Sequence, residues 1–293
     1  MEREMSRIDL LKNSLYQLIG ENDELLEVIQ EVNDKYQQIM EIYISNDKTS
    51  SAWHCSCRII LGIKELPILY EICEEIAEGF NIIACKKIES KYSSYGNGCI
   101  LRYLNINSDE KTEPYPSDII DGTNLFAEKQ NESFSEVDTL VLFALDYSIC
   151  HEVGHLLLDR EDKDVIYKEI DADCFAFETI KKVYNTETSK DQNLAYSRLI
   201  GAFIGISSIL LFRKPECENR DTDHPHTIER MLSMLNNWQI DSNSSLWEIG
   251  CYILEKWLNT NGMPLPWHKE DALSFQDKLL IAYSRINDNH QYI

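Results

Sequence analysis

The sequence is poor in positive charge. Its 28 Lys and Arg residues stand against 50 Asp and Glu residues, which gives a formal net charge of −22. A surface of this sign repels phosphate backbones and anionic lipid headgroups, and no basic cluster of useful size interrupts it. The charge balance therefore argues against nucleic-acid binding and membrane binding, and it favours a basic or neutral protein partner.

Signals for secretion and for membrane insertion are also missing. The nine cysteines are odd in number and scattered, and several lie inside apolar runs, a pattern typical of reduced thiols and not of a disulfide framework. The first residues lack the apolar core of a secretory signal. The longest apolar run, Leu199–Phe212, is too short and too mixed to span a bilayer. We therefore expect a cytoplasmic protein.

The N-terminal segment has a helical pattern of its own. Residues 6–44 contain no proline, and apolar residues recur about every 3.5 positions with Asn22 in register. A lone Asn at such a position fixes register and partner number in coiled coils, which favours a homodimer through residues 6–44. Extra apolar positions beside the seam instead favour a helical hairpin packed on the main domain. Both alternatives stay open. The turn-rich stretch 46–51 separates this segment, residues 1–46, from a main domain at 47–293.

The main domain divides into a mixed part and a helical part. Apolar stretches bounded by turn residues predict strands at 53–61, 81–91 and 99–106, with a helix at 67–80 after the first strand. The predicted fold class is therefore α+β and mainly α, with one small sheet and a set of following helices. The helices expected after residue 135 span about 136–159, 166–184, 191–213, 226–238, 244–260 and 271–287.

The motif with the clearest chemistry is His151-Glu152-Val153-Gly154-His155. Two imidazoles four residues apart lie on the same side of a helix, so both can bind one zinc ion while Glu152 takes a proton from water. Apolar runs flank the motif on both sides and carry these polar groups into the interior. Burying them without a shared partner would be costly, and the pattern therefore predicts a metal site.

A third ligand is expected from the next helix, because catalytic zinc usually has three protein ligands and one position for water. Glu169 is the candidate ligand. One turn further on, Asp173 would face the same way and could hold a zinc-bound histidine through its second ring nitrogen. Ala172 keeps this face small enough for the two helices to approach closely. Asp171 points elsewhere and is expected to be solvated or to cap the helix.

These motifs together resemble a known group of peptidases. His151-Glu152-x-x-His155 followed by Glu169-x-x-Ala172-Asp173 is similar to the glutamate zincins, which include the CAAX-prenyl proteases and the ImmA/IrrE-type peptidases. The Lit-like phage-exclusion peptidases match best, because the chain also has their strand–helix pair, their apolar run and a His-Pro-x-x-x-x-Arg motif that begins at His224 and ends at Arg230. The resemblance covers roughly residues 50–287.

The resemblance implies a function as well as a fold. It implies a zincin-like zinc peptidase that acts as an anti-phage abortive-infection effector or toxin, cleaves a host protein such as elongation factor Tu, and is activated by a phage factor or regulatory partner. His224 and Arg230 become catalytic candidates for stabilising the oxyanion or holding substrate. Which of His224, His226 and Arg230 has this role stays open. His224-Pro225 could also simply start a helix, and Arg230 could pair with an acid on a neighbouring helix.

Two other functions fit the same residues. One is an ImmA-like regulatory peptidase that cuts a repressor, although the His-Pro-x-x-x-x-Arg stretch fits the Lit-like peptidases better. The other is a non-catalytic binding module in which zinc is structural. That module would need a fourth ligand, and the nearby thiols are Cys150, which points to another side of the helix, and Cys174.

Overall fold

Helices make up most of the part of the chain that can be described. The computed structural model describes residues 23–37, 40–45, 52–55, 58–62, 66–80, 136–158, 164–188, 191–212, 225–242, 244–265, 267 and 273–289. The helices are α2 (Asp23–Tyr36), α3 (Leu66–Phe80), α7 (Glu136–Leu158), α8 (Val165–Thr188), α9 (Gln192–Phe212), α10 (Thr227–Asn237), α11 (Ser245–Thr260) and α12 (Phe275–Asn289). The six helices predicted after residue 135 are confirmed, each to within a few residues.

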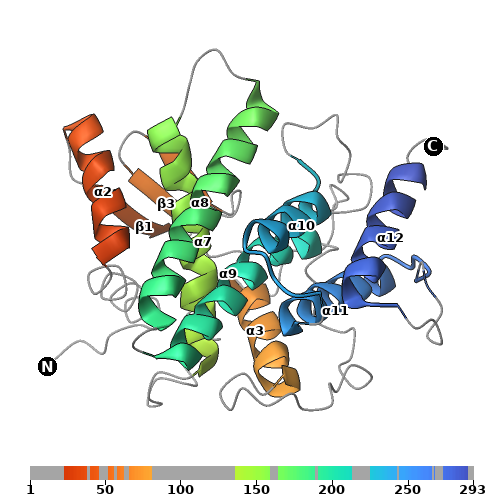
Figure 1. The fold of residues 1–293 in the computed structure, drawn as a ribbon. Helices are drawn as coiled ribbons and strands as arrows, with labels where there is room; N and C mark the ends of the chain where they lie inside the picture. The colour runs from red at the N-terminus through yellow and green to blue at the C-terminus, as the bar shows by residue number, and fades with distance from the viewer. Residues whose placement is uncertain are drawn as a thin grey trace, which may run out of the picture.

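Helices α7, α8 and α9 form the centre of the fold, and each contacts the other two (Figure 1). Two glycines of α9 let it lie directly against α7. A Cβ atom on Gly205 would lie 2.7 Å from the carbonyl oxygen of Ala144, and one on Gly201 would meet the Cβ of Phe143. The Gly201-x-x-x-Gly205 spacing therefore allows close packing of the two helices.

Two of these central helices are long and apolar enough to span a membrane by length and composition alone, namely Val137–Leu158 and Gln192–Leu211. In the structure, 83% and 78% of their most apolar windows are buried inside the protein. That burial is also what the core helices of a globular domain show. A helix that is apolar on all sides needs neighbours on all sides, and the surrounding helices supply them here.

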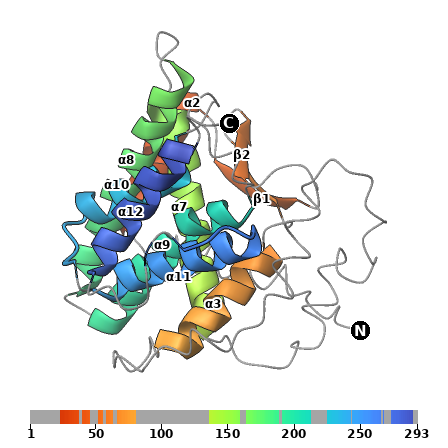
Figure 2. The same cartoon turned by 90° about the vertical axis from the view of Figure 1, so that its right-hand side faces the viewer.

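A small sheet lies at one edge of the helices (Figure 2). Its strands are β1 (Glu41–Ser45), β2 (Ala52–Cys55) and β3 (Arg58–Gly62), in the order β1-β3-β2. β1 runs parallel to β3, and β2 runs antiparallel to it. The boundary predicted near residue 46 therefore falls between two strands of one sheet. Residues 41–44, which the sequence pattern placed in a helix, are part of β1 instead.

The α+β fold class predicted from the sequence is wrong. The body of the described part is helical, every described element from Glu136 onward is a helix, and the strands have only five, four and five residues. The strands predicted at 81–91 and 99–106 lie outside the described residues. The physical reason for the correction is that the central helices are covered mainly by other helices, so the short strands at the edge of α7 do not form a second layer of the fold.

The N-terminal helix α2 packs on α7 and α8 (Figure 1). Lys35 Nζ donates to the carbonyl oxygen of Leu157 at 3.0 Å and also to that of Leu156, and Tyr36 Oη donates to the Leu156 carbonyl oxygen at 3.0 Å. Val32 of α2 is fully buried. α2 therefore packs on the main domain, while the first part of the hairpin proposed as one alternative for residues 6–44 lies outside the described residues.

Candidate active site

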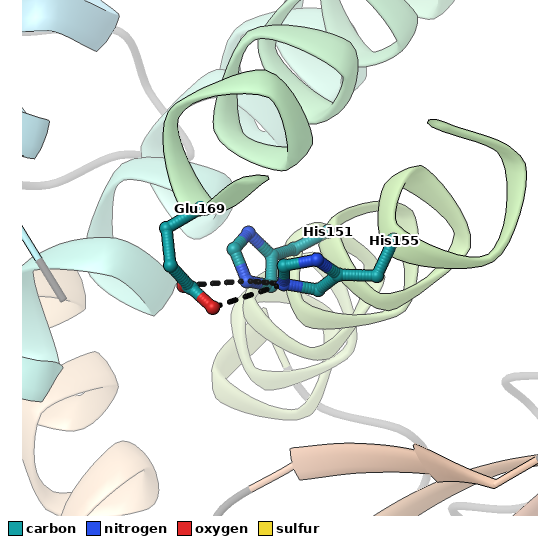
Figure 3. A group of neighbouring side chains, drawn as sticks. All are labelled: His151, His155 and Glu169. Carbon is teal, nitrogen blue, oxygen red and sulfur yellow. Dashed lines mark hydrogen bonds and ion pairs between the residues drawn. The ribbon is translucent and has the colours of Figure 1, made fainter. Parts of the chain in front are cut away.

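Three side chains from two helices converge at one point beside the centre of the fold (Figure 3). His151 and His155 lie one turn apart on α7, and their Nε2 atoms are 3.1 Å apart. Glu169, in the second turn of α8, places Oε2 at 3.4 Å from His151 Nε2 and Oε1 at 3.2 Å from His155 Nε2. The structure thus brings together the three residues that the sequence predicted as metal ligands.

The geometry of this cluster fits a divalent metal ion. Its ligand atoms all lie within 4.8 Å of one another. A tetrahedral ion with bonds of about 2.0–2.1 Å, as zinc has to nitrogen, requires ligand atoms about 3.4 Å apart. The three observed separations, 3.1, 3.2 and 3.4 Å, are close to that spacing. Two imidazoles and one carboxylate are also a donor set that leaves a position open for water.

The close approach of α7 and α8 depends on Gly154, inside the histidine motif. A Cβ atom at this position would lie 2.9 Å from the Cα of Ala172 and 3.1 Å from its carbonyl oxygen. A larger residue at either position would separate the helices and move Glu169 away from the histidines. The sequence had identified Ala172 as a residue of this contact. Gly154 was missed as its partner, although its place between the two histidines, on the helix that faces α8, was the available signal.

Asp173 contacts the cluster through the second nitrogen of one histidine. Its Oδ1 lies 2.9 Å from His151 Nδ1, and the carboxylate is almost fully buried. In the neutral imidazole, the form that binds a metal ion, a proton on Nδ1 directed to this carboxylate leaves Nε2 unprotonated and turned toward Glu169 and His155. Such carboxylates fix the ring orientation of metal-binding histidines. This is the position predicted for Asp173.

Arg230 lies behind Asp173 and not beside the three ligand atoms. Its Nε donates to Asp173 Oδ2 and its Nη2 to Oδ1, both at 2.7 Å. Tyr147, one turn before His151 on α7, donates its hydroxyl to Asp173 Oδ1 at 2.7 Å and accepts from Arg230 Nη2 at 3.2 Å. The structure therefore shows the pairing with an acid that had been the alternative to a catalytic role. Tyr147 was missed by the sequence analysis, and its spacing of four residues from His151 was the signal that could have found it.

These contacts shift the pKa values of the groups involved. Burial disfavours the charged form of His151, but the hydrogen bonds to Asp173 and Glu169 outweigh burial and raise its pKa to about 9 when no metal is bound. Burial would raise the pKa of Asp173, but the positive charges of Arg230 and His151 hold it well below its usual value. Asp173 is therefore a carboxylate that accepts hydrogen bonds at any ordinary pH.

The remaining predicted residues are placed as follows. Glu152 is buried on α7 beside His151 and is not one of the three clustered ligands. His224 lies outside the described residues. His226 is buried at the N-terminal end of α10, with its ring centroid 6.2 Å from that of Tyr283. Asp171 is half-buried and outside the cluster, and among the described residues the cluster includes no cysteine.

Comparison with known families supports a catalytic role for this site. A sequence profile of the family described as Peptidase U49 matches residues 95–250, which is more than half of the chain. The chain belongs to this family. No curated protein and no solved structure matches the chain. Peptidase U49 is the family of the Lit-like peptidases, so the resemblance drawn from the motifs is confirmed at the family level and the protein is a peptidase.

The matched region has a clear relation to the fold. It includes α7, α8, α9 and α10 and therefore all the clustered residues, together with Asp173 and Arg230. It begins after α2, the three strands and α3, and it ends inside α11. The Peptidase U49 segment thus holds the whole candidate site, while elements on both sides of it complete the packing around that site.

Proposed function

We propose that this Peptidase U49 member is a zinc-dependent endopeptidase, with His151, His155 and Glu169 as the metal ligands. The observation that carries the proposal is the convergence of two Nε2 atoms and one carboxylate at tetrahedral spacing on two closely packed helices. Zinc in such a site polarises a substrate carbonyl and makes water a nucleophile at neutral pH. The proton transfer of the reaction is assigned to a side chain of the protein.

Glu152 is the proposed general base. It is buried and directly follows the proposed ligand His151 in the sequence. In the proposed reaction it accepts a proton from the attacking water and passes it to the amine that leaves when the peptide bond breaks. In the HExxH pattern the two histidines bind the metal from one face of the helix, and the glutamate between them acts as the general base.

The proposed biological role is that of an anti-phage abortive-infection effector or toxin in the bacterial cytoplasm. Membership of Peptidase U49 and the His-Pro-x-x-x-x-Arg stretch support a Lit-like role, with a host protein such as elongation factor Tu as the substrate. The net charge of −22 supports a protein substrate over a nucleic acid. A peptidase that cleaves an essential host protein must be latent until infection, so a phage factor or regulatory partner is the proposed activator.

The decisive variant is Glu152→Gln, which keeps the shape of the side chain and removes its basicity. We expect the variant to bind zinc as the wild type does and to lose cleavage by a factor of at least about 100, the usual contribution of a general base. Zinc content is measured by mass spectrometry of the purified protein, and cleavage by incubation with purified elongation factor Tu and activator. Full cleavage by Glu152→Gln would refute the mechanism.

The substrate needs a separate experiment. Phage-infected cells that express either the wild type or Glu152→Gln are compared by proteomics for newly created protein N-termini. A fragment of elongation factor Tu that depends on Glu152 would support the Lit-like role. A repressor fragment in its place would support the ImmA-like regulatory alternative and overturn the proposed substrate.

A further inference from the structure

Three side chains hold the carboxylate of Asp173 in place. Tyr147 and His151 come from α7, and Arg230 comes from α10. Oδ1 accepts from Tyr147 Oη, Arg230 Nη2 and His151 Nδ1, and Oδ2 accepts from Arg230 Nε. All four contacts are between 2.7 and 2.9 Å. Each oxygen is therefore engaged, and the carboxylate cannot rotate without breaking at least two hydrogen bonds.

Arg230 and Tyr147 complete this arrangement through a contact of their own. Arg230 Nη2 donates to Tyr147 Oη at 3.2 Å, so the arginine, the tyrosine and Asp173 form a closed set of hydrogen bonds. Arg230 is 6% exposed and Tyr147 is 2% exposed. The planar guanidinium group of an arginine binds a carboxylate through two N–H groups at once. This bidentate contact fixes the geometry of the pair, which the ammonium group of a lysine could not do.

We propose that Arg230 and Tyr147 are positioning residues that act on the metal site through Asp173. They fix the carboxylate, the carboxylate fixes the ring of His151, and the ring presents Nε2 to the ion. The inference rests on the proposed metal site. The proposal assigns Arg230, the arginine of the His-Pro-x-x-x-x-Arg motif, a role different from oxyanion stabilisation. Its guanidinium group is bound to Asp173, and its charge is neutralised there.

The test is the zinc affinity of the full-length chain, measured by competition with a chromophoric chelator and without any substrate. We expect Arg230→Gln to weaken zinc binding by about 10–100-fold, the usual effect of losing a group that orients a ligand. Arg230→Lys should restore part of the affinity, because it returns the charge and not the bidentate contact. Tyr147→Phe removes one hydrogen bond and no charge, and we expect a smaller loss of several-fold.

A double-mutant cycle shows whether Arg230 acts through Asp173. In an Asp173→Asn background, Arg230→Gln should weaken zinc binding by less than about two-fold further, because the link between the arginine and the histidine has already been broken. The absorption spectrum of the cobalt-substituted protein should change in Arg230→Gln, since the orientation of one ligand changes. A full additional loss of affinity in the Asp173→Asn background would overturn the proposal.

Arg198→Gln is the matched control. Arg198 is also a buried arginine paired with carboxylates, here Asp146 of α7 and Glu187 of α8, but it is not in contact with the cluster. We expect this variant to lose stability and to keep its zinc affinity. An equal loss of zinc affinity in Arg198→Gln and Arg230→Gln would show a general effect of misfolding and would overturn the positioning role.

Other outcomes separate this inference from the function on which it rests. Wild-type protein that binds no zinc refutes the proposed metallopeptidase. Wild-type protein that binds zinc, with Arg230→Gln unchanged in affinity and impaired only in kcat/KM, leaves the metallopeptidase standing and assigns Arg230 to substrate. Circular dichroism and thermal unfolding check each variant, and Tyr147→Phe carries the test if Arg230→Gln does not fold.

Discussion

Gly154→Ala tests whether the contact between α7 and α8 sets the metal site. The added Cβ would lie 2.9 Å from Ala172 Cα and 3.1 Å from its carbonyl oxygen, and both are backbone atoms that cannot rotate away. To reach an ordinary contact of about 3.4 Å, α8 has to retreat by about half an ångström at this point. Metal sites tolerate about 0.2 Å in their ligand distances, and Glu169 is on the same helix, so the movement is large enough to affect the ion.

Two opposing effects decide the change in the free energy of unfolding. Replacing a helical Gly by Ala favours the folded state by about 1 kcal/mol through helix propensity. Overpacking of a well-packed contact costs about 1–3 kcal/mol. Because the clash is with backbone, we take the upper half of that range and expect a net loss of about 1–2 kcal/mol. Zinc affinity should fall together with stability.

The assay is urea unfolding of the metal-free protein combined with chelator competition for zinc. Gly79→Ala is the control, since a Cβ atom at this position in α3 would meet nothing within 4 Å. We expect this control to be neutral or stabilised by up to about 1 kcal/mol, with zinc affinity unchanged. Gly154→Ala that is as stable as Gly79→Ala and binds zinc like the wild type would refute the argument.

Two further predictions concern the metal and the packing of the helices. Removal of metal by a chelator should abolish cleavage. It should also lower Tm by about 5 °C, because an ion at 100 times its Kd stabilises the folded protein by about 2.7 kcal/mol. A Tm measured by calorimetry that does not change with the chelator would count against the metal site. Lys256→Met should lower the free energy of unfolding by about 3–5 kcal/mol in urea titrations, because it leaves the buried Glu75 carboxylate of α3 without the ammonium that contacts both its oxygens at 2.5 Å. A loss below about 1 kcal/mol would show that water replaces the lysine.

The histidine pair and the helices could be predicted because their signals are local. The spacing of His151 and His155 is a property of one helix, and long apolar stretches bounded by polar turns predicted α7–α12 well. Glu169 and Asp173 could be predicted for a similar reason, since they are one turn apart on the next helix. The approach of that helix was the one tertiary assumption, and the small residues Gly154 and Ala172 make it possible.

The sheet and the contacts of Arg230 could not be predicted in the same way. Residues 41–44 continue an apolar pattern that is also compatible with a helix, and they become part of a strand because they pair with residues of β3 that lie 17 positions further along the chain. Arg230 meets Asp173 and Tyr147 only when α10, α8 and α7 are assembled. A motif showed that the arginine mattered, and only the packing of three helices showed which group it contacts.

The contact between α2 and the last turn of α7 has a practical consequence for work on isolated fragments. Helix ends leave carbonyl oxygens without partners inside the helix, and here Lys35 and Tyr36 bind those of Leu156 and Leu157, directly after His155. A fragment cut at the limits of the Peptidase U49 match, residues 95–250, would lack this cap, the strands and α3, and would sever α11 after six of its residues. The Peptidase U49 segment, which contains the candidate site, is therefore shorter than the protein that must be expressed to study that site.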